Sequence, residues 1–120
     1  KKYLGLFNVI ESCIDLDTTW NYNISLEANV LDGAVINITN LFSYSNFPIN
    51  GYFSRVEGVV EPGSDKFTIP NQRPDDGTKS ISGSGFLVVV DSNTTNIVID
   101  YVTTNGNKSY TCQLTGVLIE

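Results

Sequence analysis

Apolar and polar residues alternate along much of the 120-residue chain, and this two-residue period is that of a half-buried β-strand. The clearest case is segment 21–30, in which Tyr, Ile, Leu, Ala and Val alternate with Asn, Ser, Glu and Asn. No helical period extends beyond about two turns. The pattern predicts eight strands, at residues 5–14, 21–30, 34–41, 52–60, 66–69, 79–91, 96–104 and 109–119.

The breaks between these strands carry turn residues. Asp32-Gly33 is a two-residue hairpin signal, and Glu61-Pro62-Gly63 ends the fourth predicted strand. Segment 71–77, with one proline and one glycine, predicts a loop, and Asn105-Gly106-Asn107 predicts a tight turn. Because most connections are short, we expect successive strands to pair in antiparallel fashion within one all-β domain over residues 1–120.

The two cysteines lie near opposite ends of the chain, Cys13 in the first predicted strand and Cys112 in the last. Two readings are open: a pair of free buried thiols in a cytosolic protein, or one disulfide in an oxidising compartment. A disulfide requires the two Cα atoms to lie within about 7 Å. It would therefore make the first and last strands neighbours, and we favour this reading.

An eight-stranded antiparallel up-and-down barrel is the architecture that these features favour. Eight strands are the number found in small closed barrels, and a link between the first and last strands fits closure. The alternative is a two-layer sandwich, which usually carries a buried Trp between its two cysteines. Trp20, at the start of the second predicted strand, does not occupy such a place.

Composition excludes several functions. The net charge of −6 and the scattering of seven basic residues argue against nucleic acid as a partner. The chain has no His, so histidine-based nucleophilic triads are excluded, and two Cys cannot form a closed zinc site. We expect no enzyme activity, no cofactor and no metal. No apolar run is long enough to span a bilayer, so we expect membrane contact only through a lipid anchor outside these residues.

Aromatic residues provide the best candidate for a binding site. Phe42, Tyr44 and Phe47 crowd an irregular segment rich in Ser, Asn, Pro and Gly, and Phe53 follows it. This segment predicts a lip over one barrel mouth, where the aromatic rings would bind a small apolar or amphipathic ligand. The alternative is that aromatic residues simply fill the core.

Glu11 is the second candidate, because it shares the inner face of the first strand with Cys13. An inward carboxylate could anchor a ligand and would have a raised pKa. The alternative is a structural Glu that is hydrogen-bonded to the backbone or to Tyr near a barrel end. Asp100 falls on the outer face of its strand, which argues against an acid/base pair with Glu11.

An ordered set of short motifs resembles those of the small, secreted, lipocalin-like (calycin-type) envelope proteins of the Bacteroidetes, most of which are lipoproteins. The resemblance covers nearly the whole chain. The motifs are Gly5-Leu6-Phe7-Asn8-Val9-Ile10-Glu11-Ser12-Cys13, Ile36-Asn37-Ile38-Thr39-Asn40-Leu41, Phe67-Thr68-Ile69-Pro70-Asn71-Gln72, Ser82-Gly83-Ser84-Gly85, Ile97-Val98-Ile99-Asp100-Tyr101 and Tyr110-Thr111-Cys112.

This resemblance implies a lipocalin-like barrel, export to the periplasm or outer membrane, and a Cys13–Cys112 disulfide. It implies little about activity. The sequence therefore predicts a non-enzymatic envelope protein that binds a small apolar ligand at the barrel mouth. A protein- or glycan-interaction module, for example a protease inhibitor or a surface-assembly component, is the alternative. The two differ in the barrel interior, which would hold a cavity in the first case and be packed in the second.

Overall fold

The computed structural model describes residues 5–14, 16, 19–28, 34–41, 53–74 and 77–119. Within these ranges the chain forms eight strands, and none of its described segments is a helix that could cross a lipid bilayer. The strands are β1 (Gly5–Cys13), β2 (Thr19–Ala28), β3 (Val35–Thr39), β4 (Val56–Val60), β5 (Lys66–Gln72), β6 (Lys79–Asp91), β7 (Thr94–Asn105) and β8 (Lys108–Leu118).

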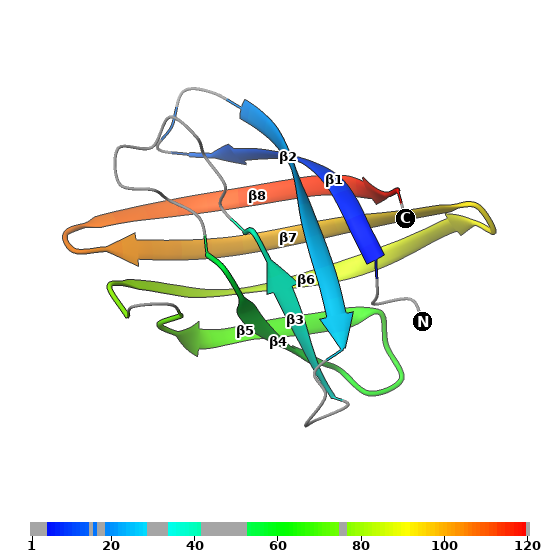
Figure 1. Ribbon diagram of the computed structural model, residues 1–120, viewed down its shortest axis with the longest axis horizontal. Coiled ribbons are helices and arrows are strands. Elements are labelled where there is room, and N and C mark those ends of the chain that lie inside the picture. The colour runs from blue at the N-terminus through cyan, green and yellow to red at the C-terminus, as the bar shows by residue number, and fades with distance from the viewer. Residues whose placement is uncertain are drawn as a thin grey trace.

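The eight strands close into one antiparallel barrel (Figure 1). Each strand pairs with the next along the chain, and β8 pairs with β1 from Phe7↔Leu118 to Cys13↔Cys112. The predicted up-and-down barrel, with its first and last strands as neighbours, is thereby confirmed. Closure leaves the sheet without a free edge along this seam.

The strands differ in length, and this shapes the barrel. β3 and β4 have 5 residues each, whereas β6 has 13 and β7 has 12. The β6–β7 hairpin therefore extends beyond the barrel wall (Figure 1). Val89 and Val90, near its tip, are 54% and 58% exposed.

The interior described by the structure is filled mainly with apolar side chains, and Glu11, Lys79 and Thr103 are the polar residues buried among the described ones. All eight strands contribute, because alternate residues point inward. Phe7, Val9, Ile24, Ile99 and Leu114 have 0% exposure. The other buried hydrophobic residues are Cys13, Leu26, Ile36, Ile38, Leu41, Phe53, Val56, Phe67, Ile69, Ile81, Leu87, Ile97, Tyr101, Tyr110 and Cys112.

Seven of the eight predicted strands differ from the structure at one or both ends, most of them by one or two residues, and the fourth and fifth differ most. The fourth strand was expected from residue 52 but begins at Val56, while Phe53 forms an isolated bridge with Leu41. The fifth was expected to stop before Pro70 but continues to Gln72. Pro70 is tolerated because the β5–β6 register shifts between Ile69 and Gln72, so a missing N–H breaks no regular ladder there.

The side chain of Gln72 replaces a missing strand pairing. β4 and β5 are paired through only two residue pairs, Val59↔Thr68 and Val60↔Phe67. Further along, Gln72 Oε1 accepts a hydrogen bond from the Glu57 N–H at 3.0 Å, and Gln72 Nε2 donates to the Glu57 carbonyl at 2.8 Å. The primary amide thus imitates a peptide group and joins the end of β5 to the start of β4.

Gly85 leaves room for a core aromatic ring. It lies opposite Phe67 in the β5–β6 pairing, and a Cβ placed on it would lie 2.4 Å from Phe67 Cζ. The ring of Phe67 therefore packs directly on the glycine backbone. A side chain at position 85 would therefore displace this ring.

Candidate functional site

The disulfide joins the two strands that close the barrel. Cys13 in β1 and Cys112 in β8 are bonded across 99 positions of sequence, with their Cα atoms 4.0 Å apart. The Ile14 N–H donates to the Thr111 carbonyl at 2.9 Å, which makes the cysteines a non-hydrogen-bonded cross-strand pair, the arrangement that brings side chains closest. The disulfide that the sequence favoured is confirmed.

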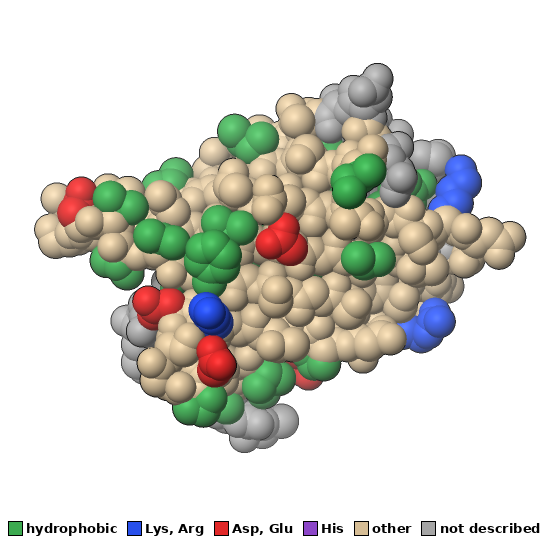
Figure 2. Space-filling view, turned by 180° about the vertical axis from the view of Figure 1, so that it is seen from behind, with side chains coloured by type: hydrophobic (Ala, Val, Ile, Leu, Met, Phe, Trp, Pro, Cys, Tyr) green, Lys and Arg blue, Asp and Glu red, His purple; other side chains and the backbone are tan. Residues whose placement is uncertain are grey.

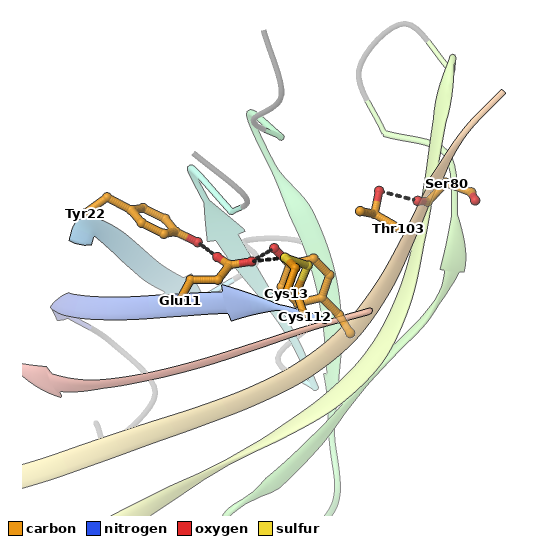
Figure 3. Close-up of a disulfide and its surroundings, with 7 residues drawn as sticks. Glu11, Cys13, Tyr22, Ser80, Thr103 and Cys112 are labelled. Carbon is orange, nitrogen blue, oxygen red and sulfur yellow. Dashed lines mark hydrogen bonds between the residues drawn. A yellow bond between two sulfur atoms is a disulfide. The ribbon is translucent and has the colours of Figure 1, made fainter. Parts of the chain in front are cut away.

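Glu11 lies beside this disulfide, inside the barrel (Figure 3). Its residue is 0% exposed. One carboxylate oxygen accepts a hydrogen bond from the hydroxyl of Tyr22 in β2, and the other accepts one from the hydroxyl of Tyr101 in β7. Cys13 Sγ lies 3.9 Å from the carboxylate. Three strands, β1, β2 and β7, therefore meet at one carboxyl group.

Burial changes the acidity of this group. Desolvation raises the pKa of Glu11 from 4.5 to about 7, although the hydrogen bonds from Tyr101 and Tyr22 favour the ionised form and oppose the rise. The pKa of Tyr101 is also raised, first by its own burial and then by the Glu11 charge. Near neutral pH the carboxyl is therefore divided between its two protonation states.

The same cluster offers atoms that could ligate a metal. Ligand atoms of Glu11, Cys13 and Cys112 lie within 4.8 Å of one another. However, both sulfur atoms are held in the disulfide, and only the thiolate form of Cys is a metal ligand. In this cluster two tyrosine hydroxyls donate hydrogen bonds to a buried acid beside the disulfide.

Asp100 takes no part in this cluster. It is exposed on β7 and accepts a hydrogen bond from Gln113 Nε2 in β8 at 2.8 Å. It thus lies on the outer wall, whereas Glu11 points inward, as the alternation of the strands indicated.

Of the aromatic residues predicted to bind a ligand, only Phe53 is among the residues that the structure describes. Phe42, Tyr44 and Phe47 lie outside the described residues. Phe53 is fully buried in the core, and the Lys79 ammonium lies 5.0 Å from the centre of its ring. Among the described candidates for ligand binding, Phe53 and Glu11 are thus both enclosed by protein.

One pocket on the barrel rim was not predicted. Its lining comes from the chain just before and within β4 and from the chain at the end of β5, and its volume is about 490 Å³. We call it the rim pocket; it is formed by Ser54, Arg55, Glu57, Gln72, Arg73 and Pro74. The two arginines are 18 positions apart, so no motif joins them. Their only signal in the sequence is that no other arginine exists in the chain.

Exposed apolar side chains also occur on the outer wall. Figure 2 shows them as separate groups on a surface with few charged side chains. Ile10, Phe86, Val88 and Val117 are 38–55% exposed. They belong to β1, β6 and β8, of which β1 and β8 are paired, whereas β7 separates β6 from β8. Isolated exposed apolar residues are normal on a β-barrel and define no site by themselves.

These features define the class of the protein as a small, closed, disulfide-linked antiparallel β-barrel. No family model matches the sequence. No curated protein matches it either.

Among solved structures, the chain is similar to a crystal structure of a protein of unknown function from Bacteroides ovatus. The TM-score is 0.60 and the sequence identity is 13%, over 97% of this chain and 41% of the other. This chain therefore spans about two fifths of that protein's length. At this identity the similarity shows the barrel fold alone.

Proposed function

We propose that this protein is a non-enzymatic binding domain of the cell envelope, which contacts a protein or glycan partner through its outer surface and rim. The observation that carries the proposal is the filled interior. A ligand-sized cavity would leave its wall with surface that a water molecule can touch. Instead, Phe7, Ile24 and Ile38, from three different strands, are 0% exposed.

The buried carboxylate inside the barrel also argues against an enclosed ligand. The Glu11 carboxylate, the polar group best placed to anchor an enclosed ligand, already accepts hydrogen bonds from Tyr22 and Tyr101 on both oxygens. A ligand would have to displace a buried hydroxyl to reach it, and leaving that hydroxyl without a partner costs about 1–3 kcal/mol.

The disulfide supports an exported location. Structural disulfides persist in the periplasm and outside the cell and are rare in the cytosol. The absence of His from the sequence and the sealing of Glu11 support a role in binding and not in catalysis, because a catalytic acid or base must reach its substrate.

Binding of a small apolar ligand at the mouth is the second candidate. It is favoured by the Leu41↔Phe53 bridge, which holds the two residues flanking the segment with Phe42, Tyr44 and Phe47 at one end of the barrel.

Lipid uptake distinguishes the two candidates. Protein purified from its own envelope is analysed by native mass spectrometry, and recombinant protein is titrated with a fluorescent fatty acid. We expect the unliganded mass and no saturable fluorescence change. A stoichiometric lipid adduct, together with saturable binding that is lost in a Phe42→Ala, Tyr44→Ala, Phe47→Ala variant and kept in a Phe86→Ala control, would establish the mouth site and reject our proposal.

A further inference from the structure

We propose that the rim pocket is an anion site, in which Arg55 and Arg73 together bind a carboxylate or phosphate group carried by the partner. This inference rests on the proposed function and deepens it, because it assigns the chemistry of one contact. The first observation is the gathering of charge: the only two arginines of a chain with net charge −6 line the same pocket.

The fold fixes the spacing of the two arginines. Arg55 immediately precedes β4 and Arg73 immediately follows β5, and the two strands are antiparallel neighbours. Gln72, next to Arg73, is bonded to the backbone of Glu57 through both atoms of its amide, at 3.0 and 2.8 Å. The backbone that carries the two guanidinium groups is therefore held before any anion arrives, which lowers the entropy cost of binding.

Most of the donors of the arginines are available within the described part of the chain. A guanidinium has five N–H donors arranged to match the oxygens of a carboxylate or a phosphate. Arg73 uses one, in a long hydrogen bond of 3.4 Å to the Gly77 carbonyl. For Arg55, no acceptor occurs among the described residues.

Carboxylates of the protein itself near the pocket would compete with a bound anion for the two arginines. Glu57 belongs to the lining, yet it forms no ion pair with Arg55 or Arg73 among the residues that the structure describes. Asp75 and Asp76 follow in the sequence and lie outside the described residues. Two cations in one pocket repel each other, and an anion between them removes that repulsion as well as forming charge-assisted hydrogen bonds.

The test uses the fact that a chain with two arginines gives only two arginine Nε–H signals in a ¹H–¹⁵N spectrum. Labelled protein is titrated with inorganic phosphate and, separately, with D-glucuronate, at constant ionic strength. We expect both Nε–H signals to shift along one common binding curve in at least one series. The series with the lower Kd identifies the source of the anionic group as a phosphate or a sugar carboxylate.

Variants distinguish a specific anion site from non-specific electrostatic attraction of the anion to the protein. Arg55→Gln and Arg73→Gln should each raise the Kd roughly tenfold or more, which is the loss of one hydrogen-bonded charge. Lys108→Gln removes the same charge from an exposed position outside the pocket and should change the Kd less than twofold. Backbone spectra confirm that each variant is folded.

Independent movement of the two signals, no movement with either anion, or equal weakening in all three variants would overturn the anion site. The lipid experiment above does not involve these arginines. Failure of the anion site therefore leaves the proposal of a surface-binding barrel standing, and the two can be rejected separately.

Discussion

At the scale of single residues, Glu11 is the buried group whose protonation state should change with pH near neutrality. It is fully buried, and its pKa is raised from 4.5 to about 7 by desolvation. Its only described hydrogen-bonding partners with titratable groups are Tyr22 and Tyr101, and the neighbouring cysteines do not titrate because they are bonded to each other. The chain has no His to titrate in the same range.

Folding stability should therefore fall as the pH rises from 4.5 to about 7. The unfolded chain releases the Glu11 proton near pH 4.5, whereas the folded chain holds it until about pH 7. The folded state binds more protons between these values, so the free energy of unfolding is highest below pH 4.5 and decreases up to about pH 7. The total decrease is on the order of 3 kcal/mol.

Urea unfolding of wild type and Glu11→Gln between pH 4 and 8.5 measures this dependence. The amide cannot ionise, so the variant should lose most of the decrease above pH 5. Glu61→Gln, which changes an exposed carboxylate, serves as the control and should retain the wild-type slope. Parallel curves for wild type and Glu11→Gln would mean that the buried carboxyl keeps an ordinary pKa.

At the scale of the elements, the junction between β4 and β5 is the weakest part of the wall. Two residue pairs join these strands, whereas β6 and β7 pair over nearly their whole length. Gln72 compensates at this junction with three side-chain hydrogen bonds, two to the backbone of Glu57 and one, of 2.9 Å, to the Pro70 carbonyl. Its role resembles that of a short additional strand.

Removal of this amide should loosen β4 locally. We expect Gln72→Ala to lower the free energy of unfolding by about 1–3 kcal/mol, because the Glu57 N–H and carbonyl lose their partners. Hydrogen exchange at the Glu57 amide should accelerate more than at core amides such as that of Ile99. Asn71→Ala, at an exposed neighbouring position, should change neither quantity. Unaltered exchange at Glu57 in the Gln72 variant would show that the contact is dispensable.

The sequence predicted the bounds of a strand correctly where the local pattern was strong, and incorrectly where tertiary contacts determined them. Lys79–Asp91 was predicted with its observed bounds because a predicted loop precedes it and turn-forming residues follow it. The strand at 66–69 was cut short because Pro70 has no N–H to donate, and only the shifted β5–β6 register explains why the strand continues. Glu11 was placed on the inner face by its alternation. The proximity of Arg55 and Arg73 depends on the register of the β4–β5 pairing and on the continuation of β5 past Pro70, which no local pattern encodes.

At the scale of the whole molecule, closure of the barrel depends on the β1–β8 seam. Seven residue pairs run from Phe7↔Leu118 to Cys13↔Cys112, and the disulfide covalently fixes one end of the seam. Because the bonded residues are 99 positions apart, the disulfide restricts the unfolded chain far more than it restricts the already closed barrel.

Loss of the disulfide should be costly. The loop-entropy relation gives a decrease of about 4–5 kcal/mol in the free energy of unfolding for the double variant Cys13→Ala, Cys112→Ala. Thermal and urea unfolding measure this decrease, and wild type held in reducing agent should behave like the variant. Equal stability of the non-reduced wild type and the double variant would show that the seam holds without its covalent link.

The covalent link also determines what a protease can do to this molecule. Residues 13 to 112 form a closed covalent ring, so a nick in any loop between them opens the ring without releasing a fragment. A single cleavage by a protease between β3 and β4, or between β5 and β6, would leave the two pieces joined by the disulfide. The mass of the molecule would increase only by that of the water consumed in hydrolysis. The two pieces would separate only after reduction.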